Sequence, residues 1–125
     1  MERGYGRIVN ISSGNALRPT TGSAAYGCSK AAVLTLTKAI AYEGAKHGVT
    51  CNAVSPGTVD TPMARAFVKP PARLEDLVKS NAFYNPMGAL LQPADIARMI
   101  VFLCHPDSRY ITGQTEYVNA GGVMP

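Results

Sequence analysis

Two short β-branched segments separated by a long helix-forming stretch constrain the fold of this chain most strongly. Residues 7–12 and residues 49–55 are rich in Ile and Val, and each has the composition of a buried strand in a parallel sheet. Between them, residues 25–47 are rich in Ala, Leu and Lys and contain no proline, which favours a helix. The order strand, loop, helix, strand predicts one βαβ unit, and with it an α/β fold.

The second half of the chain predicts a further helix and a third strand. Pro93 and Asp95 are typical of a helix start, and the apolar residues that follow recur at helical spacing. These core-facing positions are Ile96, Met99, Ile100, Leu103 and Cys104. Residues 115–119 predict the third strand. Residues 62–91 carry scattered apolar side chains among prolines, which predicts one or two short helices, either as a substrate lid or as ordinary helical packing.

The helix at residues 25–47 is expected to begin after an N-cap at Ser23 and to end at Gly48. Its apolar residues fall on two sides rather than in one stripe. One side carries Val33, Leu36 and Ile40, and the other carries Leu34, Ala41, Tyr42 and Ala45. Because a helix that is apolar on two sides is usually buried on both, we expect one side to cover the sheet and the other to meet a partner subunit.

Length and composition exclude several classes of protein. The 125 residues are 46% apolar, which suffices for the core of a single domain, and we expect no membrane span because the apolar residues form no long run. Twelve basic residues give a net charge of +4, but they are dispersed, so we expect no nucleic-acid partner. Three scattered cysteines and two histidines predict no metal site and a reduced, cytoplasmic setting, and the N-terminus lacks the apolar segment of a signal peptide.

The residues with the clearest chemistry are Tyr26 and Lys30, which are four positions apart in the expected helix and therefore lie on one face. Such a pair alone occurs by chance on many helix surfaces. However, Ser13 and the turn at residues 56–57 follow the first two strands, and ligands in open α/β sheets bind at the carboxyl ends of strands. The sequence therefore predicts one site at this rim, in which the phenol and the ammonium can act as an acid/base pair.

Residues 6–13, 25–32, 52–57 and 111–114 together resemble the classical short-chain dehydrogenase/reductase family, in both order and spacing. The resemblance extends from about residue 6 to residue 122 and is strongest to members that are like 3-oxoacyl-acyl carrier protein reductase. It implies the C-terminal half of a Rossmann-type, doubly wound parallel sheet, with three strands and flanking helices. It also implies hydride transfer between NAD or NADP and a small-molecule alcohol or ketone.

The resemblance also assigns roles to individual residues. Ser13 would orient the substrate oxygen, Tyr26 would donate or accept the proton, and Lys30 would hold the nicotinamide ribose. The nicotinamide side of the cofactor would be lined by Pro56, Gly57, Val59 and Thr61, together with Tyr26 and Lys30. Asn52 precedes the turn and is expected to be structural.

Several features of the family have no counterpart in these 125 residues. A Gly-x-x-x-Gly-x-Gly turn for the cofactor phosphates is absent, and so is the residue that selects NAD over NADP. We therefore expect a single partial domain at residues 1–125 without the N-terminal dinucleotide-binding half, an unpaired apolar edge on the strand at 7–12, and negligible activity of the isolated chain. The alternatives are a non-catalytic module that forms homo-oligomers or docks on full-length relatives, and a fragment that does not fold stably.

Overall fold

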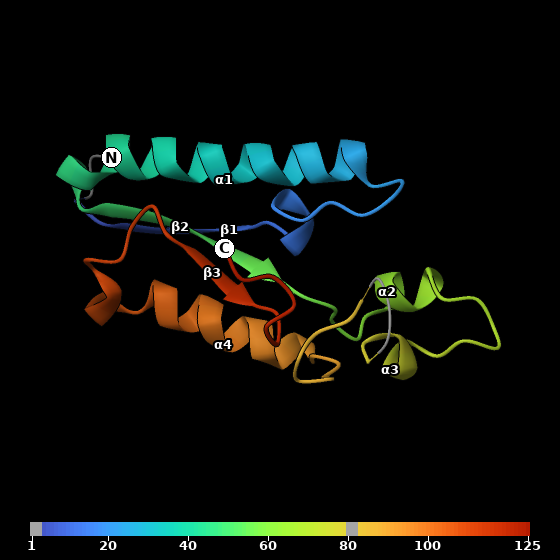
Figure 1. The fold of residues 1–125 in the computed structure, drawn as a ribbon. Coiled ribbons are helices and arrows are strands. Elements are labelled where there is room, and N and C mark those ends of the chain that lie inside the picture. Colours follow the sequence, from blue (N-terminus) through green and yellow to red (C-terminus); the bar gives the residue numbers. More distant parts are fainter. Residues whose placement is uncertain (1–3, 80–82) are drawn as a thin grey trace.

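A computed structural model describes residues 4–79 and 83–125, and in these ranges a three-stranded parallel sheet lies between two layers of helices (Figure 1). The central strand is β2 (Val49–Pro56), with β1 (Gly6–Ile11) on one side and β3 (Thr115–Val118) on the other. Helix α1 (Ala24–Gly44) covers one face, and α4 (Pro93–Cys104) covers the other. The predicted half of a Rossmann-type sheet is confirmed.

The face of α1 that meets the sheet is built from small residues. Thr37 and Ala41 are buried there, and a Cβ at Gly44 would lie only 3.1 Å from the Cβ of Val49. Small side chains thus let the helix approach the sheet closely. The helix is long, but none of the helices in the described ranges is both long and apolar enough to span a membrane.

The expectation that one side of α1 covers the sheet is confirmed, and the expectation that its other side meets a partner subunit stays a prediction. Leu36, from one predicted apolar side, is 54% exposed, and Tyr42, from the other, is 89% exposed. Leu36 and Tyr42 are directed away from the centre of the buried face, which is marked by Thr37 and Ala41, because successive helical residues are rotated by about 100°. The sheet therefore covers one side of α1 only.

The two ends of α1 differ in how well the sequence predicted them. Ser23 occupies the N-cap position, but its hydroxyl does not cap the helix, because its Oγ accepts from the backbone N of Thr20 at 2.8 Å and donates to the carbonyl oxygen of Thr20 at 2.6 Å. At the other end, a short turn η2 (Ala45–His47) leads to Gly48, whose φ of 69° is left-handed. The predicted glycine stop is confirmed.

The opposite face of the sheet carries the larger apolar core. Val54, Ile96 and Leu103 are buried against one another, and half-buried side chains surround them. These surrounding residues are Val9, Val59, Met99, Ile100, Ile111 and Val118. The predicted stripe on α4 is thus confirmed up to Leu103, but Cys104 is exposed because it is rotated by about 100° from Leu103 around the helix.

The loop before β3 is held by Asn52, which is fully buried. Its Nδ2 donates to the carbonyl oxygen of Ile111 at 2.8 Å, and its Oδ1 accepts from the backbone N of Gln114 at 3.0 Å. Both ends of the amide are therefore used within the fold. This confirms the interpretation of Asn52 as a structural residue.

The chain between β2 and α4 forms an excursion that contains two short helices, α2 (Pro62–Ala66) and α3 (Leu74–Leu77). Figure 1 shows this excursion extending beyond the carboxyl ends of the strands. The prediction of short helices is confirmed. Within the predicted lid region 62–91, residues 80–82 lie outside the described residues, and the role as a substrate lid stays a prediction.

Strand β1 pairs with β2 on one side only, within the part of the chain that the structure describes. Ile8 is 37% exposed and Ile11 is 42% exposed, although both are β-branched residues of a strand. The expected apolar edge on this strand is therefore confirmed, and such an edge favours pairing with a further strand.

Two buried serines near the ends of β1 and β2 allow a matched stability test. Ser12 Oγ donates to the carbonyl oxygen of Lys30 at 2.9 Å, whereas Ser55 Oγ has no hydrogen-bond partner among the described residues. A buried hydroxyl without a partner costs about 1–3 kcal/mol. We expect Ser12→Ala to lower the free energy of unfolding by about 1 kcal/mol and Ser55→Ala to leave it unchanged or raise it by about 1 kcal/mol. Urea unfolding of both variants checks this, and an equal loss of stability in the two would contradict it.

Candidate active site

The predicted site residues come together at one end of the sheet. Ser13 follows the carboxyl end of β1, Tyr26 lies in the first turn of α1, and Pro56 is the last residue of β2. Figure 1 shows that the carboxyl ends of these strands and the N-terminal end of α1 lie on the same side of the molecule as the α2–α3 excursion. Because β1 and β2 are parallel, their carboxyl ends meet at one rim.

Lys30 is fixed to the end of β1 at both its side chain and its backbone. Its Nζ donates to the carbonyl oxygen of Ile11 at 3.1 Å, and its own carbonyl oxygen accepts from Ser12 Oγ at 2.9 Å. The Nζ atom lies 5.7 Å from the centroid of the Tyr26 ring. Tyr26 is 47% exposed. A positive charge is thus held beside a phenol that a ligand can reach.

Ser13 is held by the short turn η1 (Gly14–Ala16), of which it is the N-cap residue. Its Oγ accepts from the backbone N of Asn15 at 3.2 Å. Since this contact uses the hydroxyl as an acceptor, the hydroxyl hydrogen remains available to donate to a ligand.

Gly27 brings the Ser13 turn and the Tyr26 turn into direct contact. It is buried, and a Cβ at this position would lie 2.9 Å from the carbonyl oxygen of Asn15. No larger residue fits without a backbone shift. The sequence analysis missed Gly27, although a glycine beside Tyr26 in an otherwise strongly helix-forming segment was a signal of close packing.

The turn after β2 is clamped against β3. The backbone N of Gly57 donates to the carbonyl oxygen of Val118 at 2.9 Å, and a Cβ at Gly57 would lie 2.8 Å from the Cα of Asn119. Asn119, which the sequence analysis also missed, is 5% exposed and accepts from the backbone N of Gly121 at 2.9 Å through its Oδ1. This packing fixes the position of Pro56 and Gly57 at the rim.

The chain that leaves this turn carries the two remaining predicted cofactor residues. Val59 forms an isolated parallel bridge with Leu91, which joins the start of the excursion to its end. Thr61 Oγ1 accepts from the backbone N of Ala64 at 3.2 Å and thereby caps α2. The structure therefore gives both residues a local role in shaping the loop, and their contact with a cofactor stays a prediction.

An ionic cluster ties the excursion together. Arg65 Nε and Nη2 donate to the two carboxylate oxygens of Asp60 at 2.6 and 2.7 Å, and Nη2 also donates to Glu75 Oε1 at 3.0 Å. Glu75 belongs to α3, so the guanidinium links the two short helices to the turn before them. The hydrogen bond from Arg65 lowers the pKa of Asp60. The pKa of Glu75 is lowered first by its own backbone N–H and then by Arg65.

These lowered pKa values predict a pH dependence for the excursion. A carboxyl whose pKa is lower in the folded state contributes stability above its ordinary pKa of about 4, and this stability is lost as the pH falls through the lowered value. We expect the Asp60 carboxyl signal, followed by carbon-13 NMR, to titrate at higher pH in Arg65→Gln than in the unchanged chain. Arg98→Gln, which removes the partner of Asp95 on α4, is the control and should leave Asp60 unaffected. Identical titration of Asp60 in all three proteins would contradict the cluster.

Comparison with known proteins identifies relatives of this chain. A family model described as enoyl-(acyl carrier protein) reductase, within the short-chain dehydrogenases/reductases, matches residues 1–122. The chain belongs to the short-chain dehydrogenase/reductase family. It is 43% identical over 120 residues to acetoacetyl-CoA reductase of Rhizobium meliloti, and the match covers 96% of this chain and 48% of that protein. It is 38% identical over 124 residues to 3-oxoacyl-[acyl-carrier-protein] reductase of Rickettsia felis, with 99% of this chain and 49% of that protein covered.

A solved structure shows the same short-chain dehydrogenase/reductase fold. A crystal structure of a candidate gluconate dehydrogenase from Agrobacterium tumefaciens superposes with a TM-score of 0.84 at 32% sequence identity. The match covers 98% of this chain and 48% of that chain. The chain thus spans about half the length of the relatives that it matches.

Proposed function

We propose that this chain forms the catalytic half of a nicotinamide-dependent oxidoreductase, in which Ser13, Tyr26 and Lys30 interconvert an alcohol and a ketone. One observation carries the proposal. The ammonium of Lys30 lies 5.7 Å from the Tyr26 ring and is anchored to the strand that leads to Ser13. The proposal is thus supported by a fixed acid/base group, a fixed cation and a free hydroxyl donor on one rim.

Each of the three side chains has a distinct task. The Tyr26 phenol gives its proton to the carbonyl oxygen when a ketone is reduced and takes a proton from the hydroxyl in the reverse direction. The Lys30 ammonium stabilises the negative charge that develops on the phenol oxygen as the proton leaves. Ser13 donates a hydrogen bond to the substrate oxygen and so positions it. The Ser13 oxygen already accepts from Asn15 N, and the hydroxyl hydrogen is free for this bond.

The residues at the rim fit the nicotinamide end of NAD or NADP. An ammonium has three donors, and only one bond from Lys30 Nζ is made within the described structure, to the Ile11 carbonyl, so two donors remain for ribose hydroxyls. Pro56 is the last residue of the neighbouring strand β2, and it would line the other side together with Gly57, Val59 and Thr61, which follow the strand. When bound, the cofactor supplies the hydride.

We further propose a 3-oxoacyl thioester as the substrate. Two of the relatives are named as reductases of acetoacetyl-CoA and of 3-oxoacyl-acyl carrier protein. The excursion beside the rim exposes apolar side chains suited to an acyl chain, since Met63 is 72% exposed and Phe67 is 76% exposed. The proposal accordingly makes residues 62–91 a substrate lid.

A second candidate function, a docking module for its own copies or for full-length relatives, is favoured by the uncovered apolar surface. Leu36 and Tyr42 on α1 and Ile8 on β1 are exposed although they are apolar. Size-exclusion chromatography of the chain, alone and mixed with the Rhizobium meliloti reductase, tests this function. A shift of the chain to a larger species supports docking, and elution as a monomer in both runs contradicts it.

Catalysis is tested in a longer protein that also contains the N-terminal half of the fold, which the matched relatives have in addition. In this completed protein, the N-terminal half of the Rhizobium meliloti reductase is joined to the 125-residue chain. We expect it to oxidise NADH or NADPH in the presence of acetoacetyl-CoA, followed by the loss of nicotinamide absorbance. The natural reductase is the positive control. A completed protein that folds and binds the cofactor but turns over no ketone would contradict the proposed function.

A further inference from the structure

A groove of about 520 Å³ lies next to the proposed active site and contains none of the proposed catalytic or cofactor-binding residues. Its volume is within the usual range of small-molecule sites. The groove is lined by Leu17, Arg18, Tyr84, Pro86 and residues 121–125. Its walls thus come from the loop after Ser13, from the end of the excursion and from the C-terminal segment.

The groove begins directly beside Ser13. A Cβ at Gly14 would lie 3.0 Å from Cγ2 of Val123, so the turn that positions Ser13 packs against a wall of the groove. On the other side, a Cβ at Gly121 would lie 3.3 Å from Cδ of Pro86. These contacts hold the three walls together. When the carbonyl group of a ligand lies at Ser13, the rest of the ligand can therefore extend into the groove.

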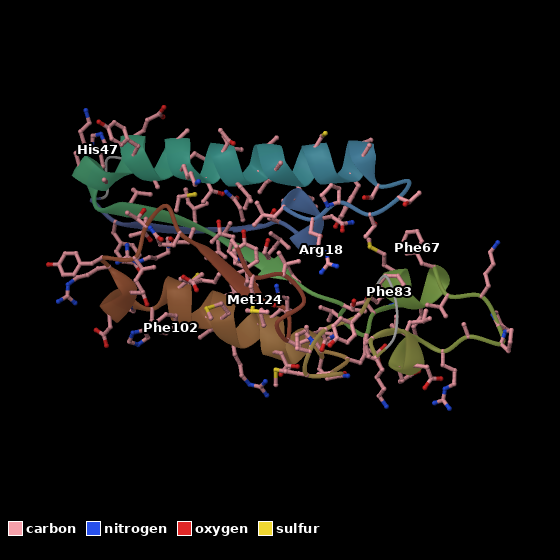
Figure 2. The ribbon with its side chains drawn as sticks, in the orientation of Figure 1. Arg18, His47, Phe67, Phe83, Phe102 and Met124 are labelled. Atoms are coloured by element: carbon pink, nitrogen blue, oxygen red, sulfur yellow. The ribbon has the colours of Figure 1, made fainter. Side chains whose placement is uncertain are left out.

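Arg18 is the one charged side chain among the residues that line this groove. Its Nη1 lies 3.4 Å from the carbonyl oxygen of Gly122, and no ion pair involves its guanidinium in residues 4–79 and 83–125. In Figure 2 the side chain extends from the loop after η1 toward the C-terminal segment that carries Met124. An exposed cation without an acidic partner stands at the wall of a largely apolar groove.

We propose that Arg18 makes this groove a subsite for the anionic end of the substrate. The apolar stem of the ligand packs against Leu17, Tyr84 and Met124, and a phosphate or carboxylate pairs with the guanidinium through two parallel hydrogen bonds. The subsite rests on the proposed function, because it places the reacting carbonyl at Ser13. It makes Arg18 a residue that selects anionic substrates over neutral ones of the same acyl chain.

The test measures binding of three ligands to the 125-residue chain by NMR titration. Acetoacetyl-CoA carries phosphates, acetoacetate carries a carboxylate, and the acetoacetyl thioester of N-acetylcysteamine is neutral. We expect Arg18→Gln to weaken binding of acetoacetyl-CoA about tenfold and to leave binding of the neutral thioester unchanged. Arg109→Gln is the matched control, because it removes an exposed arginine that stacks on Tyr110, outside the groove. If Arg18→Gln also weakens the binding of acetoacetate, the site accepts carboxylates as well as phosphates.

The same variants in the completed protein separate this inference from the proposed function. A raised KM for acetoacetyl-CoA in Arg18→Gln, with kcat and the KM for the neutral thioester unchanged, supports the subsite. The subsite is overturned if acetoacetyl-CoA does not bind the chain, if Arg18→Gln weakens both thioesters equally, or if it weakens neither. Binding that depends on Arg18 without any turnover contradicts the proposed function and leaves the subsite in place.

Discussion

Replacing Tyr26 by phenylalanine is expected to slow ketone reduction by the completed protein about 10²–10⁴-fold, which is the usual contribution of a general acid. The substitution removes only the phenol oxygen. The ring keeps its place beside Lys30, whose Nζ remains bonded to the carbonyl oxygen of Ile11. Because Tyr26 is 47% exposed, the loss of its hydroxyl leaves no unsatisfied buried partner, and folding should be unaffected.

The measurement is kcat with acetoacetyl-CoA, together with cofactor affinity from nicotinamide fluorescence. Tyr42→Phe is the matched control, since Tyr42 is on the same helix and is 89% exposed. We expect the control to retain full activity and Tyr26→Phe to retain cofactor binding. Near-normal turnover in Tyr26→Phe would remove Tyr26 from the proposed mechanism.

The isolated 125-residue chain is expected to be slower than the completed protein by a factor of about 10⁵ or more. The chain supplies residues for the nicotinamide end of the cofactor, but its sequence contains no Gly-x-x-x-Gly-x-Gly turn for the pyrophosphate. Fixing two reactants in a productive geometry contributes about 7–11 kcal/mol to lowering a barrier. Without the phosphate anchor, most of this contribution is lost even though the three proposed catalytic side chains are in place.

Both proteins are assayed at equal concentration with NADH and NADPH over a range of cofactor concentrations. Adding the N-terminal half of the Rhizobium meliloti reductase as a separate chain is the control, and it should restore part of the activity if the two halves associate along β1. Turnover of the isolated chain close to that of the completed protein would show that the rim alone holds the cofactor.

The elements that the sequence predicted well are those set by local patterns. The strands, α4 and the stop at Gly48 follow from runs of β-branched residues, from helical spacing and from a left-handed glycine. The Tyr26–Lys30 pair could be predicted for the same reason, since four residues in a helix place two side chains on one face. Their position at the rim followed from the order of the elements.

Other features depend on contacts between distant residues and were not predictable from local patterns. Ser23 is a residue type that often caps helices, but its hydroxyl hydrogen-bonds to the backbone of Thr20 instead. Leu36 and Tyr42 are apolar, and the pattern of α1 did not show which of its apolar residues the sheet leaves exposed. The contact between Gly27 and Asn15, which joins two parts of the site, is also a tertiary contact.

The sequence by itself thus determined the family and the order of the elements, and it singled out the three residues for which we propose catalytic chemistry. These depend on residue type and short spacing, which the chain carries locally. The tertiary structure alone decided how those residues are held and what surrounds them. It fixed Lys30 to the end of β1, and it placed Arg18 against the C-terminal segment beside Ser13. Arg18 and Gly122 are far apart in the chain, so only the packing of three separate segments could bring them to one groove.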